Sequence, residues 1–160
     1  MSASVTIRAY RPEDLERLKA ITIVCFEGVA IDHNIEQRFG LVADKDWKWR
    51  KARHLDDDVV EEHREGVFVG EIEGLVLGYV TCRLDRATDI GRIPNIAVLP
   101  EARGQGLGKQ LMEHALAYFR EHEMRFAKIE TLDQNPIGQQ FYPSMGFEEV
   151  GRQIHYLKEL

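Results

Sequence analysis

A glycine-rich turn in the middle of the chain has the residue types of an anion-binding loop. Gly104, Gly106 and Gly108 alternate with other residues between Arg103 and Lys109. Glycine lets the backbone approach a ligand closely, and the first turn of a helix leaves its backbone N–H groups unpaired. A helix that begins at this turn would therefore offer N–H donors, beside two cations, to a phosphate group.

Two common phosphate-binding patterns do not fit this turn. A P-loop has a glycine five residues before its Gly-Lys pair and Ser or Thr after the pair, but Arg103 and Gln110 stand at these positions. A dinucleotide fingerprint would need glycine where the chain has Lys109. The pattern that remains is Arg-x-x-Gly-x-Gly, from Arg103 to Gly108. A tight turn without a ligand is the alternative.

The elements on either side of the turn are a strand and a helix. Residues 90–98 are rich in β-branched residues, and Pro100 closes the strand because it has no N–H to donate. A helix is expected over about 106–123, because apolar residues recur every four positions on one face. This stripe consists of Leu107, Leu111, Ala115 and Phe119.

A second strand, over 126–132, follows the helix. A strand–helix–strand unit predicts that the two strands are parallel, with a right-handed crossover. Asn135 and Pro136 then open a short helix, with Asn as its N-cap, and Met145-Gly146 ends it. A final hairpin is expected from 147–150 and 153–157. The order of elements predicts a mixed α/β sheet with helices packed on it rather than a doubly wound nucleotide fold.

The Arg-x-x-Gly-x-Gly turn, followed downstream by Asn135, Phe141-Tyr142 and Gly146-Phe147, resembles the GNAT superfamily of acyl-CoA-dependent N-acetyltransferases. The resemblance covers about residues 70–157. It implies a mostly antiparallel sheet with a central parallel βαβ unit, acetyl-CoA as acyl donor, and direct transfer to an amine without an acyl-enzyme. The residues that it implies for binding acetyl-CoA are Ile96, Ala97, Val98, Arg103, Gly104, Gln105, Gly106, Leu107, Gly108, Lys109, Asn135 and Tyr142.

The resemblance also implies roles in the transfer step. Tyr142 matches the general acid that protonates the leaving thiolate, although core packing beside Phe141 is the alternative. A backbone N–H near Ile96 or Val98 could polarise the thioester carbonyl.

Many family members carry a glutamate on the central strand that serves as the base, but residues 92–95 contain no carboxylate. Asn95 could order a relaying water, Glu130 is the carboxylate candidate, and Asp89 is a third choice. Asn135 is a helix cap, a cofactor contact, or both.

Composition sets limits on the partners. The 160 residues suffice for one domain over 1–160, and the net charge of −6 disfavours nucleic acid. No apolar run is long enough to span a membrane. Cys25 and Cys82 lie in apolar segments, which favours free thiols in a reducing cytoplasm. The acidic segment 56–62 hints at a cationic acceptor.

The N-terminal half gives weaker signals. A strand is expected over 5–10, a helix from Pro12, and a hairpin over 67–84, whereas 29–41 shows no clear period. A helix over about 44–64 would bury a stripe through Trp49, Ala52, Leu55 and Val59. Trp47 falls off this stripe and could face a substrate, a partner subunit or solvent. His54, Asp58 and Glu62 could line up as metal ligands, but a solvated acidic face is the default and no metal is expected.

The sequence thus predicts an N-acetyltransferase that moves acetyl from acetyl-CoA to a primary amine. Polyamine-like molecules, amino acids, an aminoglycoside, and a protein amino terminus or lysine all remain open as acceptors. The alternatives are an acyl-CoA-binding sensor without transfer activity and a nucleotide-phosphate enzyme. A homodimer is possible through Trp47 and the final hairpin.

Overall fold

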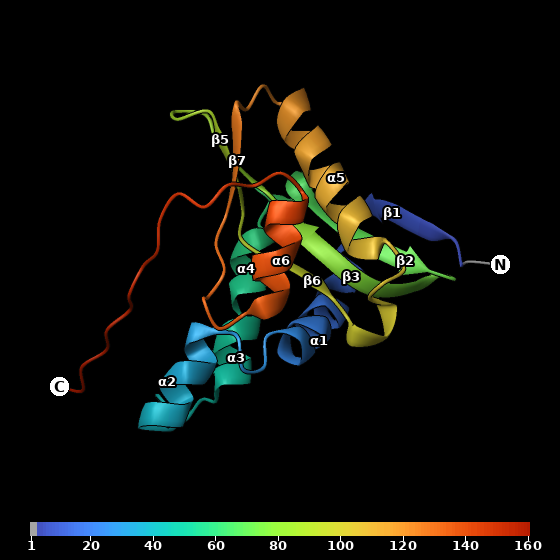
Figure 1. The fold of residues 1–160 in the computed structure, drawn as a ribbon. Coiled ribbons are helices and arrows are strands. Elements are labelled where there is room, and N and C mark those ends of the chain that lie inside the picture. The colour runs from blue at the N-terminus through green and yellow to red at the C-terminus, as the bar shows by residue number, and fades with distance from the viewer. Residues whose placement is uncertain (1–2) are drawn as a thin grey trace.

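The fold is built on a β-sheet that divides into two parts (Figure 1). In the computed structural model, which describes residues 3–160, the strand orders are β1-β2-β3-β6 and β4-β5-β7. Met1 and Ser2, the first residues of the expected domain, lie outside this range. The strands are β1 (Val5–Ala9), β2 (Val67–Ile72), β3 (Leu75–Thr81), β4 (Arg83–Asp85), β5 (Ile90–Ile93), β6 (Ile96–Val98) and β7 (Phe126–Ile129).

Helices cover both faces of the sheet. The α-helices are α1 (Leu15–Cys25), α2 (Ile31–Phe39), α3 (Trp47–Ala52), α4 (His54–Asp58), α5 (Leu107–Glu121) and α6 (Pro136–Ser144). Short 3-10 turns lie at Pro12–Asp14, Arg64–Gly66 and Pro100–Ala102. One apolar cluster gathers around α5, and a second joins α1 and α4 to the opposite face of β2 and β3.

The central unit is β5–α5–β7, and its two strands are parallel. Every other strand pair is antiparallel, so the expected mixed, mostly antiparallel fold class is confirmed. The predicted stripe of α5, from Leu107 to Phe119, is buried against the sheet. Gly91 of β5 permits this packing, because a Cβ there would lie 2.3 Å from the Phe119 ring.

The strand expected over 90–98 is interrupted. Pro94 and Asn95 separate β5 from β6, so the two halves of this segment join different parts of the sheet. β5 pairs with β4 and β7, whereas β6 pairs with β3. The interruption is therefore the point at which the sheet divides.

The region between α1 and β2 differs most from expectation. Residues Ile31–Phe39 form α2 although they show no clear period, and the single helix expected over 44–64 breaks at Arg53 into α3 and α4. The break changes the helical phase, so Trp47 is buried with 5% of its surface exposed, whereas Trp49 is 48% exposed. The predicted stripe is therefore wrong at Trp49. It holds at Leu55 and Val59, which belong to the buried cluster.

The predicted final hairpin does not form. Residues 147–160 contain no strand, and they run away from the body of the molecule beyond α6 (Figure 1). A strand requires a neighbour that pairs its backbone groups, and this segment meets none. Its apolar side chains are consequently exposed, Val150 at 92% and Tyr156 at 88%.

Candidate active site

The glycine turn forms the entrance to α5. Gly104 and Gly106 adopt φ angles of 78° and 85°, which favour glycine, and Gly106 is the N-cap of the helix. No side chain caps this helix, so the N–H groups of its first turn remain available to a ligand. A Cβ at Gly104 or Gly106 would meet no atom within 4 Å. The turn is thus open on the side from which an anion would approach.

One edge of β6 lies beside this turn and pairs with no strand among residues 3–160. The Asn95 carbonyl accepts a hydrogen bond from the Thr81 N–H of β3 at 2.8 Å. The Leu99 N–H donates one to the Leu77 carbonyl of β3 at 2.9 Å. Because the backbone groups of a strand alternate in direction, those of Ile96 and Val98 face the free edge. The Val98 carbonyl accepts a hydrogen bond from Arg103 Nε at 3.1 Å, which ties the turn to the strand.

Helix α6 brings Asn135 and Tyr142 to the same side of the sheet. The Asn135 side chain caps the helix by accepting from the Gly138 N–H at 3.3 Å. Tyr142 packs against the cluster that contains Ile96 and Val98. Burial raises the pKa of its phenol to about 12. The phenol therefore keeps its proton throughout the physiological range and can act as a donor.

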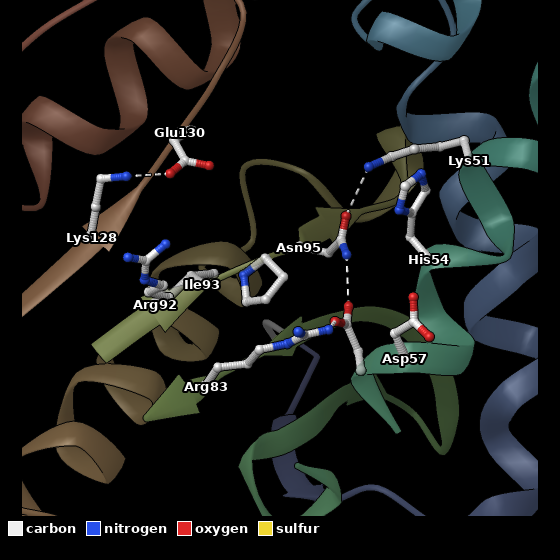
Figure 2. A pocket seen from close by; sticks show the side chains of 11 residues that line it. Lys51, His54, Asp57, Arg83, Arg92, Ile93, Asn95, Lys128 and Glu130 are labelled. Carbon is white, nitrogen blue, oxygen red and sulfur yellow. Dashed lines mark hydrogen bonds and ion pairs between the residues drawn. The ribbon is translucent and has the colours of Figure 1, made fainter. Parts of the chain in front are cut away.

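A polar cavity of about 330 Å³ lies where the sheet divides (Figure 2). α3 and α4 form one wall, and β4, β5 and β7 form the other. The side chains that line it are Lys51, His54, Asp57, Asp58, Arg83, Arg92, Ile93, Pro94, Asn95, Lys128 and Glu130.

Asn95 forms the centre of this cavity, and both ends of its side-chain amide form a hydrogen bond. Its Nδ2 donates to Asp58 Oδ2 at 2.8 Å, and its Oδ1 accepts from Lys51 Nζ at 2.9 Å (Figure 2). Asp58 in turn accepts from Arg83 at 2.6 Å. Asn95 and Asp58 are both buried. Asn95 thus joins the two walls, and each of its amide groups keeps one further hydrogen-bonding position, so its role in ordering a relaying water stays a prediction.

The other two candidate bases lie in different places. Glu130 lines the cavity, is exposed, and pairs with Lys128. Asp89 lies in the turn that precedes β5, where its carbonyl accepts from the N–H groups of Arg125 and Phe126. It does not line the cavity.

Lys51 is a group that the sequence patterns did not single out. Burial lowers the pKa of its ammonium below the ordinary value, although the charges of Asp32 and Asp58 oppose this effect. The ammonium also lies 4.2 Å from the centroid of the Phe26 ring. A lysine with a lowered pKa beside a binding cavity can serve as a proton acceptor. No local motif marks it, because its surroundings come from segments far apart in the chain.

Neighbouring His54 forms a hydrogen bond with Asp32, and its Nε2 lies 3.4 Å from Asp32 Oδ2. This hydrogen bond is the main reason why the pKa of the Asp32 carboxyl is lowered. Among residues 3–160, no three His, Cys, Asp or Glu side chains gather closely enough to hold a metal ion. Within the same range, every helix is too short or too polar to traverse a bilayer.

Comparison with known proteins identifies the family. The model of the acetyltransferase (GNAT) family matches residues 30–147, which is most of the chain. The chain belongs to the GNAT family. An uncharacterized N-acetyltransferase of Archaeoglobus fulgidus is 34% identical over 91 residues, covering 54% of this chain and 62% of that protein. The putative [ribosomal protein bS18]-alanine N-acetyltransferase of Bacillus subtilis is 30% identical over 99 residues, covering 62% and 64%. Each match thus spans less than two thirds of the relative.

The solved structures agree with this GNAT assignment at the level of the fold. Aminoglycoside N-acetyltransferase AAC(6')-Iy in complex with CoA superimposes with a TM-score of 0.65 at 20% identity, covering all of this chain and 98% of that one. The residues of this site are suited to bind CoA, independently of the comparison. The uncapped start of α5 is suited to a diphosphate, and the free edge of β6 is suited to an extended arm that carries amides.

Proposed function

We propose that this chain is an N-acetyltransferase that moves acetyl from acetyl-CoA directly to a primary amine. The observation that carries the proposal is the placement of three features side by side. The uncapped, glycine-lined start of α5 lies next to the free edge of β6, and Asn95, the residue before β6, lies on the wall of the polar cavity. The start of α5 suits the diphosphate, the edge of β6 suits the pantetheine arm, and the polar cavity suits the acceptor.

The turn and the strand edge hold the donor. The backbone N–H groups from Gly104 to Gly108 bind the diphosphate, and Arg103 and Lys109 add positive charge. The backbone groups of Ile96 and the N–H of Val98 pair with the amides of the pantetheine arm as a further strand would, while the Val98 carbonyl stays bonded to Arg103 and Cys25. Ala97 faces β3 and supports this edge from behind. When bound, acetyl-CoA supplies an acetyl group activated as a thioester.

Backbone and phenol groups then serve the transfer. The N–H of Ile96 or Val98 polarises the thioester carbonyl. Tyr142 donates its phenolic proton toward the departing sulfur, whose own pKa as a free thiol is about 8.5. Because the pKa of Tyr142 is raised to about 12, the phenol is protonated whenever the sulfur leaves.

The acceptor amine must lose a proton before it attacks, since an alkylamine is almost fully protonated at pH 7. Two groups of the cavity can take this proton. Lys51 is half-buried and desolvation lowers its pKa, and Glu130 is a carboxylate on the opposite wall. We favour Lys51, because Glu130 is exposed and already paired with Lys128.

Titration calorimetry with acetyl-CoA, followed by thiol-release assays across a panel of amines, tests the proposal. We expect saturable binding and turnover with at least one amine. Binding without turnover on any amine would instead support the acyl-CoA sensor. ATP binding that rivals CoA binding in a thermal-shift comparison would support a nucleotide-phosphate enzyme. If acetyl-CoA does not bind at all, the proposal is wrong.

We also propose that the chain forms a homodimer through residues 147–160. This tail exposes Val150, Ile154 and Tyr156, and the edge of β7 opposite β5 pairs with no strand among residues 3–160. Trp47 is buried within the fold and is therefore not part of this interface. Light scattering should show a dimer that Ile154→Glu weakens. Leu75→Glu, at an exposed leucine on β3 outside the tail, is the control. A monomeric wild type would contradict the proposal.

A further inference from the structure

Three cations stand in a row across the wall of the cavity. Arg92 of β5 is the register partner of Arg83 on β4 and of Lys128 on β7. Gly91 and Ile93, on either side of Arg92, face α5 and the core. The alternation of a strand therefore directs Arg92 to the other face, into the cavity (Figure 2). Like charges directly opposite one another destabilise a sheet, so such a row calls for an explanation.

Two of the three cations are neutralised within the chain. Arg83 pairs with buried Asp58, and Lys128 pairs with Glu130. Among the described residues, no carboxylate lies within ion-pair distance of Arg92, which stands between the other two. The row thus has one uncompensated positive charge, at its centre.

The opposite wall carries the complementary charge. Asp57 lines the cavity from α4 and is exposed, and no cation among residues 3–160 lies within ion-pair distance of it. Figure 2 shows Asp57 and His54 on this wall, across the cavity from Arg92. The wall formed by α3 and α4 therefore offers the carboxylate of Asp57 opposite Arg92, and the Lys51 ammonium of the same wall is bonded to Asn95 between them.

We propose that the acceptor is a small amine that also carries a carboxylate, and that Arg92 binds this carboxylate. The inference rests on the proposed function, and it names the substrate class. The guanidinium presents a planar fork of donors that matches a carboxylate. The amine end then lies toward Asn95 and the start of β6, where the acetyl group is delivered, and Asp57 attracts it. The volume of about 330 Å³ is at the lower end of small-molecule sites.

The acidic segment 56–62 suggests a cationic acceptor, and this arrangement disfavours an acceptor that carries a second positive charge. Within that segment, Asp58 is buried and committed to Arg83 and Asn95, and only Asp57 joins it in lining the cavity. A second ammonium group would meet Arg92 and its two cationic neighbours. The tertiary structure thus reverses the charge preference that local composition indicates.

The test uses three-carbon amines that differ only at the far end: β-alanine, propylamine and 1,3-diaminopropane. The full chain, Arg92→Gln and Arg92→Lys are compared by thiol release, with Arg120→Gln on α5 as a control for the loss of one surface charge. Because a charge-assisted pair is strong, we expect kcat/KM for β-alanine to exceed that for propylamine about tenfold or more. Arg92→Gln should abolish this ratio, Arg92→Lys should retain part of it, and Arg120→Gln should leave it intact. 2-Aminoethylphosphonate tests whether a phosphonate replaces the carboxylate.

A binding measurement separates this inference from the proposed function. The same compounds are titrated against the CoA-bound protein and followed by thermal shift. If β-alanine binds selectively and Arg92→Gln removes the selectivity, the inference holds even when no acetyl is transferred. If propylamine or 1,3-diaminopropane binds and reacts as well as β-alanine, or if the ratio survives Arg92→Gln, the inference is overturned. No selective binding in any arm overturns it as well.

Discussion

Asp58 is the side chain whose replacement should cost this fold most within the cavity. Its side chain is 2% exposed, and it accepts hydrogen bonds from Arg83 at 2.6 Å and from Asn95 at 2.8 Å. Asp58→Asn keeps the shape but removes the charge and turns one acceptor into a donor. One of the two partners must then face a donor rather than an acceptor. The Lys51–Asn95–Asp58–Arg83 connection between the two walls is broken.

The expected loss in the free energy of unfolding follows from the burial of Asp58 and Arg83. Breaking a buried ion pair costs about 3–5 kcal/mol. The Arg83 side chain is 35% exposed, however, so water screens part of its charge. We therefore expect a loss of about 2–3 kcal/mol in the free energy of unfolding. For a chain of this size, that corresponds to a fall of about 5–10 °C in the melting temperature.

Urea denaturation and thermal melts of Asp58→Asn measure this loss. Asp57→Asn is the matched control, because the neighbouring carboxylate is exposed and forms no ion pair within the described residues. Its effect should stay within about 0.5 kcal/mol. If the two variants lose the same stability, the reasoning from burial and hydrogen bonding is refuted.

Three further predictions concern the donor site and the proton transfers. Gly106→Ala should strain the loop by about 1 kcal/mol or more and weaken acetyl-CoA binding in calorimetry. Gly40→Ala, at a similar positive φ after α2, should not weaken acetyl-CoA binding, and equal effects of the two variants would contradict the role of the loop. Tyr142→Phe should slow thiol release about a hundredfold while acetyl-CoA still binds, whereas Tyr118→Phe on α5 should not slow thiol release. Because the pKa of Tyr142 is about 12, its deprotonation should not slow the wild-type reaction below about pH 11. Burial lowers the pKa of Lys51, so the unfolded chain binds this proton more tightly than the folded chain does. The free energy of unfolding should therefore rise with pH from the lowered pKa up to about 10.4. Urea titrations of Lys51→Met should lack this rise, and a parallel rise in both proteins would contradict the assignment to Lys51.

The local sequence predicts those features of the fold that depend only on residues close together in the chain. The glycine turn, the buried stripe of α5 and the Asn135 cap are local, because a helix repeats every 3.6 residues and its ends need particular residues. The order of strands and helices then restricted the topology, since a β–α–β connection makes its strands parallel. The Gly106 turn and the parallel pair of β5 with β7 were therefore predictable.

The charges that line the proposed acceptor cavity depend on how distant segments of the chain pack together. Asn95 meets Asp58 and Lys51 across 37 and 44 residues, and the row of Arg83, Arg92 and Lys128 depends on the register of three strands. The break at Arg53 buried Trp47 and directed Trp49 outward. Such contacts are set by packing among distant segments, and a change of one residue in register sends a side chain to the other face of a sheet. Local sequence patterns do not determine this register, so the proposed acceptor site could be recognised only in the folded chain.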